Sequence, residues 1–125
     1  MSNLVEPVGV DHVAINVPDV PGAIVFYTET IGLVQNHTRP DFGFPGAWLD
    51  TANGQQVHLI GGDTPPNLGQ HFALAFEDLP AVVAALRNSG LQVTDPIDVG
   101  TTGRKQAFMT DPWGNGIELH QRPPS

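Results

Sequence analysis

The amino-acid sequence repeats itself, and this repeat constrains the fold more than any other feature of the chain. The segment DHVAINVPDVPGAIVFY aligns with QHFALAFEDLPAVVAAL, so that His12 falls on His71. Nearer the end of each half, GQQVHLI aligns with GNGIELH, which sets His58 against Glu118. Because identities occur at both ends of each half, we interpret the pattern as an internal duplication. The chain is therefore expected to contain two modules of the same structure.

Each half reads as a strand followed by a helix. The segments VAINV and FALAF alternate in the way of half-buried strands. Asp19 and Asp78 then stand where helix N-caps are expected, each with a proline two residues later, and Gly32 and Gly90 mark the helix ends. The spacing predicts one helix in each module, directly after the first strand.

Further strands complete each half. GAWLDTANGQQVHLI predicts a hairpin with a two-residue turn at Asn53-Gly54, and RKQAFMTDPWGNGIELHQ predicts its counterpart with a turn over residues 111–114. The segment GGDTPPNLG (residues 61–69) reads as a linker. The sequence thus predicts an α+β fold of two βαβββ modules, residues about 9–62 and 69–121, within a single domain of residues 1–125.

Composition limits the partners of this protein. Five basic residues face thirteen acidic ones, a net charge of −8, which disfavours nucleic acids and anionic membranes because both would be repelled. The chain has no cysteine, and its start lacks the basic and apolar regions of a signal peptide. No apolar run is long enough to span a membrane. We expect a cytoplasmic protein that acts on a small molecule.

Strand alternation places four polar residues, His12, His58, His71 and Glu118, on the sheet faces opposite the helices. Small alanines stand beside them, at positions 14, 73 and 75. One interpretation is a sheet face that is simply wet. The interpretation that we favour is a metal site, because imidazole nitrogens with one carboxylate oxygen suit Zn, Ni, Fe, Co or Mn and leave positions open for a substrate.

The motifs DHVAINV, FY...IGL, HFALAF.DL and DPWGNGIEL together resemble those of the vicinal oxygen chelate superfamily, over roughly residues 9–121. That superfamily includes glyoxalase I, methylmalonyl-CoA epimerase, extradiol dioxygenases, fosfomycin-resistance transferases and bleomycin-binding proteins. The resemblance implies mixed sheets that curve around a cleft, with a divalent metal ion held by the first and last strand of each module. Those strands carry His12, His58, His71 and Glu118, the same four residues.

One residue departs from the pattern of the superfamily. Glyoxalase I-like members usually have glutamate where His58 stands, and the epimerases have glutamine. A glyoxalase-type reaction needs a base that moves a proton next to a carbonyl while the metal stabilises the enediolate oxygens. We therefore assign catalytic roles to His58 and Glu118, and we leave open whether His58 is a ligand or a base.

The resemblance leaves the reaction class open. A glyoxalase I-like lyase or isomerase is the leading expectation, an extradiol-type oxygenase or a fosfomycin-resistance-type transferase is the alternative, and a bleomycin-type binding protein is the non-catalytic alternative. A homodimer is expected. The candidate substrate contacts are aromatic or basic side chains near these strands: Phe44, Trp48, Arg104, Phe108 and His120.

Overall fold

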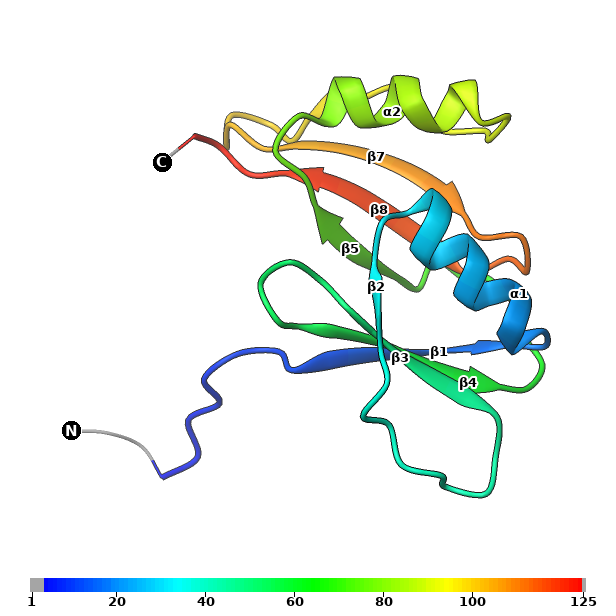
Figure 1. Ribbon diagram of the computed structural model, residues 1–125. Helices are drawn as coiled ribbons and strands as arrows, with labels where there is room; N and C mark the ends of the chain where they lie inside the picture. Colours follow the sequence, from blue (N-terminus) through cyan, green and yellow to red (C-terminus); the bar gives the residue numbers. More distant parts are fainter. Residues whose placement is uncertain (1–3, 125) are drawn as a thin grey trace. The chain divides into compact units, whose positions relative to one another are not determined.

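The computed structural model describes residues 4–124. The chain divides into two compact units, one up to Asp63 and one from Thr64 (Figure 1). Each unit has one four-stranded mixed sheet with a helical segment after its first strand. The predicted α+β fold with two βαβββ modules is therefore confirmed.

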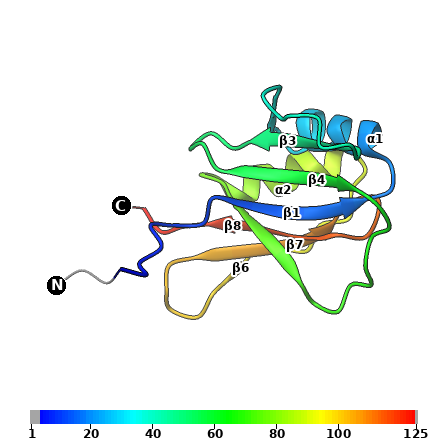
Figure 2. The same cartoon turned by 90° about the horizontal axis from the view of Figure 1, so that it is seen from below.

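Unit 1 contains a sheet in the order β1-β4-β3-β2, with β1 and β4 parallel and the other neighbours antiparallel. Figure 2 shows β4 between β1 and β3. Its elements are β1 (His12–Val17), α1 (Val20–Val25), the π-helix η1 (Phe26–Thr30), β2 (Val34–Asn36), β3 (Gly46–Asp50) and β4 (Gln56–Gly61).

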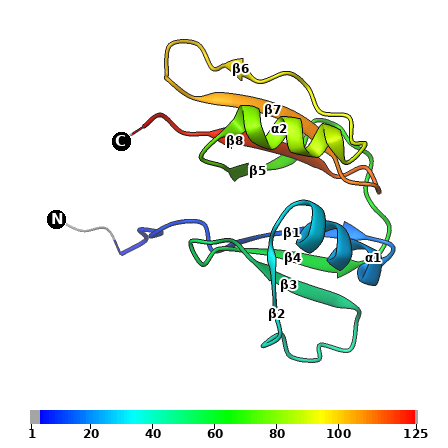
Figure 3. The same cartoon turned by 45° about the horizontal axis from the view of Figure 1, so that its top comes forward.

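Unit 2 repeats this order, with β5 and β8 parallel in a sheet of order β5-β8-β7-β6. Its helix lies along β7 and β8 (Figure 3). Its elements are β5 (His71–Ala75), α2 (Leu79–Asn88), β6 (Ile97–Asp98), β7 (Lys105–Thr110) and β8 (Gly116–Gln121).

The predicted helix signals are confirmed in both units. The side chain of Asp19 accepts a hydrogen bond from the backbone N–H of Gly22 at 3.0 Å, and Asp78 accepts one from Ala81 at 3.2 Å. Each bond satisfies one of the N–H groups that a helix start leaves unpaired. The helices end before Gly32 and Gly90, whose positive φ angles of 94° and 88° suit glycine.

The first helix changes its hydrogen-bond pattern halfway along. After α1 the turns widen into the π-helix η1, and the N–H of Ile31 donates to the carbonyl of Phe26 at 3.2 Å. The hydroxyl of Thr28 donates to the carbonyl of Ile24 at 2.7 Å and so occupies a carbonyl that an α-helix would use for its own ladder. The apolar spacing predicts a helix here but not this widening.

The predicted two-residue turn at Asn53-Gly54 is wrong, because β3 and β4 are joined by a five-residue loop, residues 51–55. The N–H of Thr51 donates to the carbonyl of Gln55 at 2.9 Å, and only Gly54 has a positive φ. A type I′ turn would need a positive φ at Asn53 as well. Instead, Oδ1 of Asn53 accepts from the hydroxyl of Thr51 at 2.6 Å. This bond is consistent with the wider loop.

The loop between β7 and β8 has the same form. The N–H of Asp111 donates to the carbonyl of Asn115 at 2.9 Å, and Gly114 has a φ of 100°. The duplication therefore extends to the turns, and it sets the same strand register in both units.

Strand alternation separates an apolar face from a polar face in each sheet, as predicted. The apolar residues of β4 and β8 that flank His58 and Glu118 are almost fully buried. The positions between them are only partly buried or exposed. The buried strand residues that build the two cores include Val57, Leu59, Ile117 and Leu119.

Among residues 4–124, no helix has the length and apolar character needed to cross a membrane.

Candidate functional site

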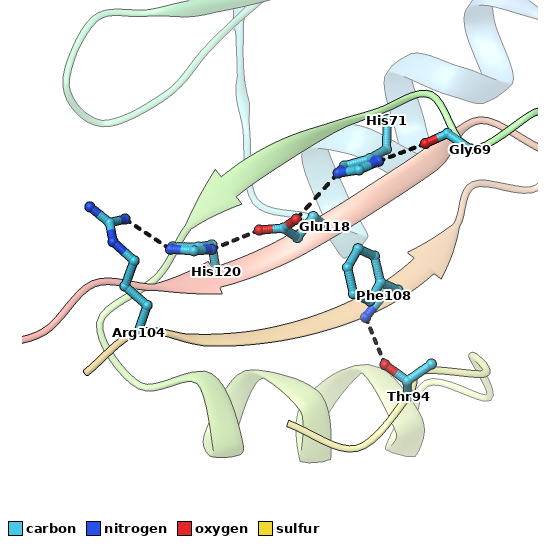
Figure 4. A network of polar contacts seen from close by, with 7 residues as sticks. All are labelled: Gly69, His71, Thr94, Arg104, Phe108, Glu118 and His120. Carbon is cyan, nitrogen blue, oxygen red and sulfur yellow. Dashed lines mark hydrogen bonds and ion pairs between the residues drawn. The ribbon is translucent and has the colours of Figure 1, made fainter. Parts of the chain in front are cut away.

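In unit 2, the polar face of the sheet is organised around Glu118. This residue lies in β8 between Ala73 of β5 and Phe108 of β7. Its Oε1 atom lies 3.2 Å from Nε2 of His71, and its Oε2 atom lies 2.7 Å from Nδ1 of His120 (Figure 4). The Glu118 side chain is only 13% exposed, so two imidazoles rather than bulk water surround the carboxylate.

The proton of His120 can be placed from its neighbours. Nη1 of Arg104 lies 3.0 Å from Nε2 of His120, and a guanidinium can only donate. Nε2 of His120 must therefore accept, so the ring is neutral and its proton is on Nδ1. That N–H donates to Glu118 and fixes the orientation of the carboxylate. Both Arg104 and His120, predicted as substrate contacts, lie in this chain of hydrogen bonds.

Nε2 of His71 faces the carboxylate of Glu118. Nδ1 of His71 lies 2.9 Å from the carbonyl oxygen of Gly69, which can only accept, so Nδ1 carries a proton. In a neutral His71, Nε2 would then be an acceptor facing a carboxylate oxygen that is also an acceptor. A second ring proton or a cation beside Nε2 resolves this conflict. A divalent metal fits: two ligands at ~2.1 Å from one ion are roughly 3–3.5 Å apart at tetrahedral or octahedral angles.

Phe108, a predicted substrate contact, lies against the side of His71. The two rings meet edge to face, with centroids 5.7 Å apart, and the backbone N–H of Phe108 donates to the hydroxyl of Thr94 at 2.8 Å. A pocket of about 610 Å³ opens here. Its lining includes His71, Phe108, Gln70, Gln92, Val93, Thr94, Met109 and Ile117.

In unit 1, the polar face of the sheet carries a stack of three rings. His58 lies between His12 and Trp48, with ring centroids at 3.8 Å and 4.9 Å and an interplanar angle of 13° on each side. The strands position these rings, because Trp48 pairs with His58 across β3 and β4 while His12 begins β1. The structure thus brings together two predicted metal ligands and one predicted substrate contact.

His58 is held by a chain of side chains that defines its tautomer. Nε2 of Gln56 donates to Asp50 at 2.9 Å, which turns Oε1 of Gln56 toward Nε2 of His58 at 2.8 Å. Nε2 of a neutral His58 therefore carries the proton, and the lone pair is on Nδ1. Burial lowers the pKa of His58; nearby His12 lowers it too, Asp11 raises it and Arg39 lowers it. The neutral ring is favoured, as a metal ligand or a base requires.

His12 is oriented by the preceding residue. Its Nδ1 atom lies 2.8 Å from the carboxylate of Asp11, so a neutral His12 has its lone pair on Nε2. A carboxylate partner of this kind commonly orients histidines that bind metals. In the stacked arrangement the lone pairs of His12 and His58 lie in two parallel planes, so the rings would have to rotate to share one ion.

A small aromatic pocket of about 260 Å³ lies beside the stacked rings in unit 1. The loop between β2 and β3 supplies Arg39, Phe42 and Phe44, and β3 supplies Trp48. Phe44 and Trp48 are predicted substrate contacts, whereas the sequence pattern does not single out Arg39 as a pocket residue. The alternation of Arg39, Phe42 and Phe44 with proline and glycine in this loop gave too weak a signal for a site.

The predicted metal ligands are divided equally between the units: His12 and His58 lie in unit 1, and His71 and Glu118 lie in unit 2. Within the described residues, no three histidine, aspartate, glutamate or cysteine side chains form a group that could hold a metal ion. The four-ligand set therefore stays a prediction. In unit 2, His71 and Glu118 supply an imidazole nitrogen and a carboxylate oxygen, which are common ligands of divalent metal ions.

Comparisons with known proteins give the family. Residues 9–119 match the model of the Glyoxalase/Bleomycin resistance protein/Dioxygenase superfamily, and the chain belongs to that superfamily. A "Probable lactoylglutathione lyase" of Vibrio parahaemolyticus is 32% identical over 123 residues, covering 88% of each chain.

Two further relatives agree with this assignment. A lactoylglutathione lyase of Arabidopsis thaliana is 32% identical over 125 residues, covering 91% of this chain but 44% of that relative. The crystal structure of a "putative glyoxalase family protein" from Bacillus anthracis superposes with a TM-score of 0.82 at 25% identity, covering 98% of this chain and 99% of that one.

Proposed function

We propose that this protein is a divalent-metal-dependent enzyme, a glyoxalase-like lyase or isomerase that acts on a small substrate with vicinal oxygens. The observation that carries this proposal is the arrangement of Glu118. His120 occupies one carboxylate oxygen, and the other oxygen faces Nε2 of His71 at 3.2 Å. The lactoylglutathione lyase names of two relatives at 32% identity support the same reaction class.

His12, His58, His71 and Glu118 would hold the metal ion. When bound, the ion would act as a Lewis acid toward a carbonyl oxygen of the substrate. We assign proton transfer either to the carboxylate of Glu118 or to Nδ1 of His58. In the second case His58 is not a ligand, because Nδ1 carries the only lone pair of the ring, and the other three residues hold the ion. Nδ1 of His58 is suited to this role because Gln56 fixes the proton of the ring on Nε2. Glu118 is suited because His120 fixes the orientation of its carboxylate.

Isomerisation of the hemithioacetal of methylglyoxal and glutathione tests the proposal, because its product is lactoylglutathione. Protein treated with chelator should be inactive, and addition of Zn, Ni, Co, Mn or Fe salts should restore thioester formation. Glu118→Gln should remain inactive with every metal, whereas the charge control Glu77→Gln, at an exposed residue of unit 2, should behave as the wild type. An absence of metal-dependent thioester formation with all five metals would refute the assignment to this reaction.

A further inference from the structure

Arg39 is held in one position over the aromatic pocket of unit 1. Its Nη2 donates to the carbonyl of Phe44 at 3.1 Å, and its guanidinium carbon lies 5.1 Å and 5.2 Å from the ring centres of Phe42 and Phe44. A Cβ atom on Gly46 would lie 2.7 Å from Nη2, so a residue without a side chain lets the guanidinium lie close to β3. The position of this cation therefore depends on at least three residues around it.

Arg39 has no carboxylate partner among residues 4–124, in a chain with thirteen acidic and five basic residues. By contrast, Arg87 pairs with Asp95 and Lys105 pairs with Asp98. The hydrogen bonds of Arg39 to the described residues use the carbonyls of Phe44 and Pro40, which leaves three of its five N–H donors for a ligand. A guanidinium with several free donors suits a carboxylate.

Most of the side chains that line the pocket are aromatic or aliphatic. Phe42, Phe44 and Trp48 face it together with the imidazoles of His12 and His58. Its volume of about 260 Å³ lies below the ~300–1,000 Å³ of sites for drug-sized ligands, so it suits a single ring. Aromatic walls favour a planar ring, which can stack or meet them edge to face.

We infer that this pocket binds a small aromatic carboxylate, with its ring against Trp48 and the phenylalanines and its carboxylate on Arg39. The pocket is lined by His12 and His58, two predicted metal ligands, so the inference deepens the proposed function. That this ligand is part of the substrate rests on the proposed function. Binding itself requires only unit 1. The ligand class assigned to the pocket in this way is an aromatic compound with an acidic group.

Calorimetric titration of chelator-treated protein with benzoate tests the inference. Two comparison ligands separate the contributions: benzamide keeps the ring without the charge, and cyclohexanecarboxylate keeps the charge without the planar ring. Benzoate should bind at least ~10-fold more tightly than benzamide, because a charge-assisted contact to Arg39 is lost. It should bind ~2- to 10-fold more tightly than cyclohexanecarboxylate.

Variants locate the binding site. Arg39→Met should weaken benzoate binding at least ~10-fold, and Arg39→Lys should give an intermediate loss because lysine keeps the charge but not the planar fork. Arg122→Gln removes one positive charge from unit 2 and should leave benzoate binding unchanged. Equal binding of benzoate and benzamide, or equal losses in Arg39→Lys and Arg122→Gln, would overturn the inference.

The experiment also separates this inference from the proposed function. Benzoate binding to metal-free protein does not depend on lyase activity, so it can succeed where the hemithioacetal assay fails. Conversely, a metal-dependent lyase that does not bind benzoate would retain the proposed function and refute the aromatic-acid pocket. Binding of benzoate only after metal is added would place the carboxylate on the metal and overturn the role of Arg39.

Discussion

Nη1 of Arg104 lies 3.0 Å from Nε2 of His120, and this contact determines which nitrogen of His120 carries the proton. Since the guanidinium donates, the imidazole must donate through Nδ1, and its acceptor is Glu118 at 2.7 Å. Arg104 therefore acts on Glu118 through His120 and is a positioning residue. Outer contacts of this kind orient metal ligands in many proteins.

This chain of contacts predicts an order of metal affinities. Glu118→Gln removes the charged oxygen donor and should reduce metal retention most strongly. His120→Leu removes the hydrogen bonds to Glu118 and Arg104 but no predicted metal ligand, so we expect ~10-fold weaker metal binding, within the range typical of outer contacts. Arg104→Met should cost the same or less. Competition with a chromogenic chelator measures all three.

Arg122→Gln is the matched control for Arg104→Met, because it also removes one charge from unit 2. It should retain wild-type metal affinity. If His120→Leu lost as much metal as Glu118→Gln, His120 would be a ligand and the tautomer assigned to it would be wrong.

Metal binding should also stabilise the folded protein. A ligand at ~100 times its dissociation constant adds about 2.7 kcal/mol to the free energy of unfolding. For a domain of this length that corresponds to a rise in Tm of roughly 10 °C. Differential scanning fluorimetry of chelator-treated protein, with and without added metal, measures the rise. His71→Ala should show a much smaller rise, and an equal rise in this variant would remove His71 from the ligand set.

The repeat and strand alternation suffice to predict the faces of both sheets. Alternation has a period of two, so a buried Val57 and Leu59 require that His58 point away from the core. The same argument places Glu118 opposite Ile117 and Leu119. The N-caps were predictable as well, because Asp followed two residues later by proline is a local signal that does not depend on the rest of the fold.

The hydrogen-bond networks were not predictable from strand parity. Parity puts His120 and Glu118 on one face, but the 2.7 Å contact depends on rotamers and on Arg104, which precedes a neighbouring strand. Similarly, Asn53-Gly54 has the dipeptide signal of a tight turn. The side-chain bond between Asn53 and Thr51 accompanies a longer loop. The hydrogen-bond partners and the loop length depend on side-chain contacts that the local sequence pattern does not reveal.

The depressed pKa of His58 predicts a pH dependence of stability in chelator-treated protein. In the unfolded chain His58 takes up a proton near its ordinary pKa of 6.5, whereas in the folded protein burial delays this uptake. The unfolded state therefore binds more protons as the pH falls below ~6.5, and the free energy of unfolding decreases. Above this pH both states hold a neutral ring and the contribution is constant.

Urea unfolding at several pH values, compared between the wild type and His58→Gln, isolates this contribution. Glutamine does not titrate, so the variant should lose less stability than the wild type when the pH is lowered from ~7.5 to ~5.5. Parallel pH profiles for the two proteins would contradict the lowered pKa.

The close approach of the backbone at Gly46 gives a final prediction, with a matched control in the same unit. A Cβ atom at Gly46 would lie 2.5 Å from the carbonyl oxygen of Leu59, a backbone atom that side-chain rotation cannot move. Gly46→Ala should therefore destabilise the protein by ~1–3 kcal/mol, the usual cost of overpacking. A Cβ at Gly9 would meet no atom within 4 Å, so Gly9→Ala should change stability by less than ~0.5 kcal/mol. Urea unfolding of both variants measures the difference, and equal stabilities would show that β3 and β4 can separate at no cost.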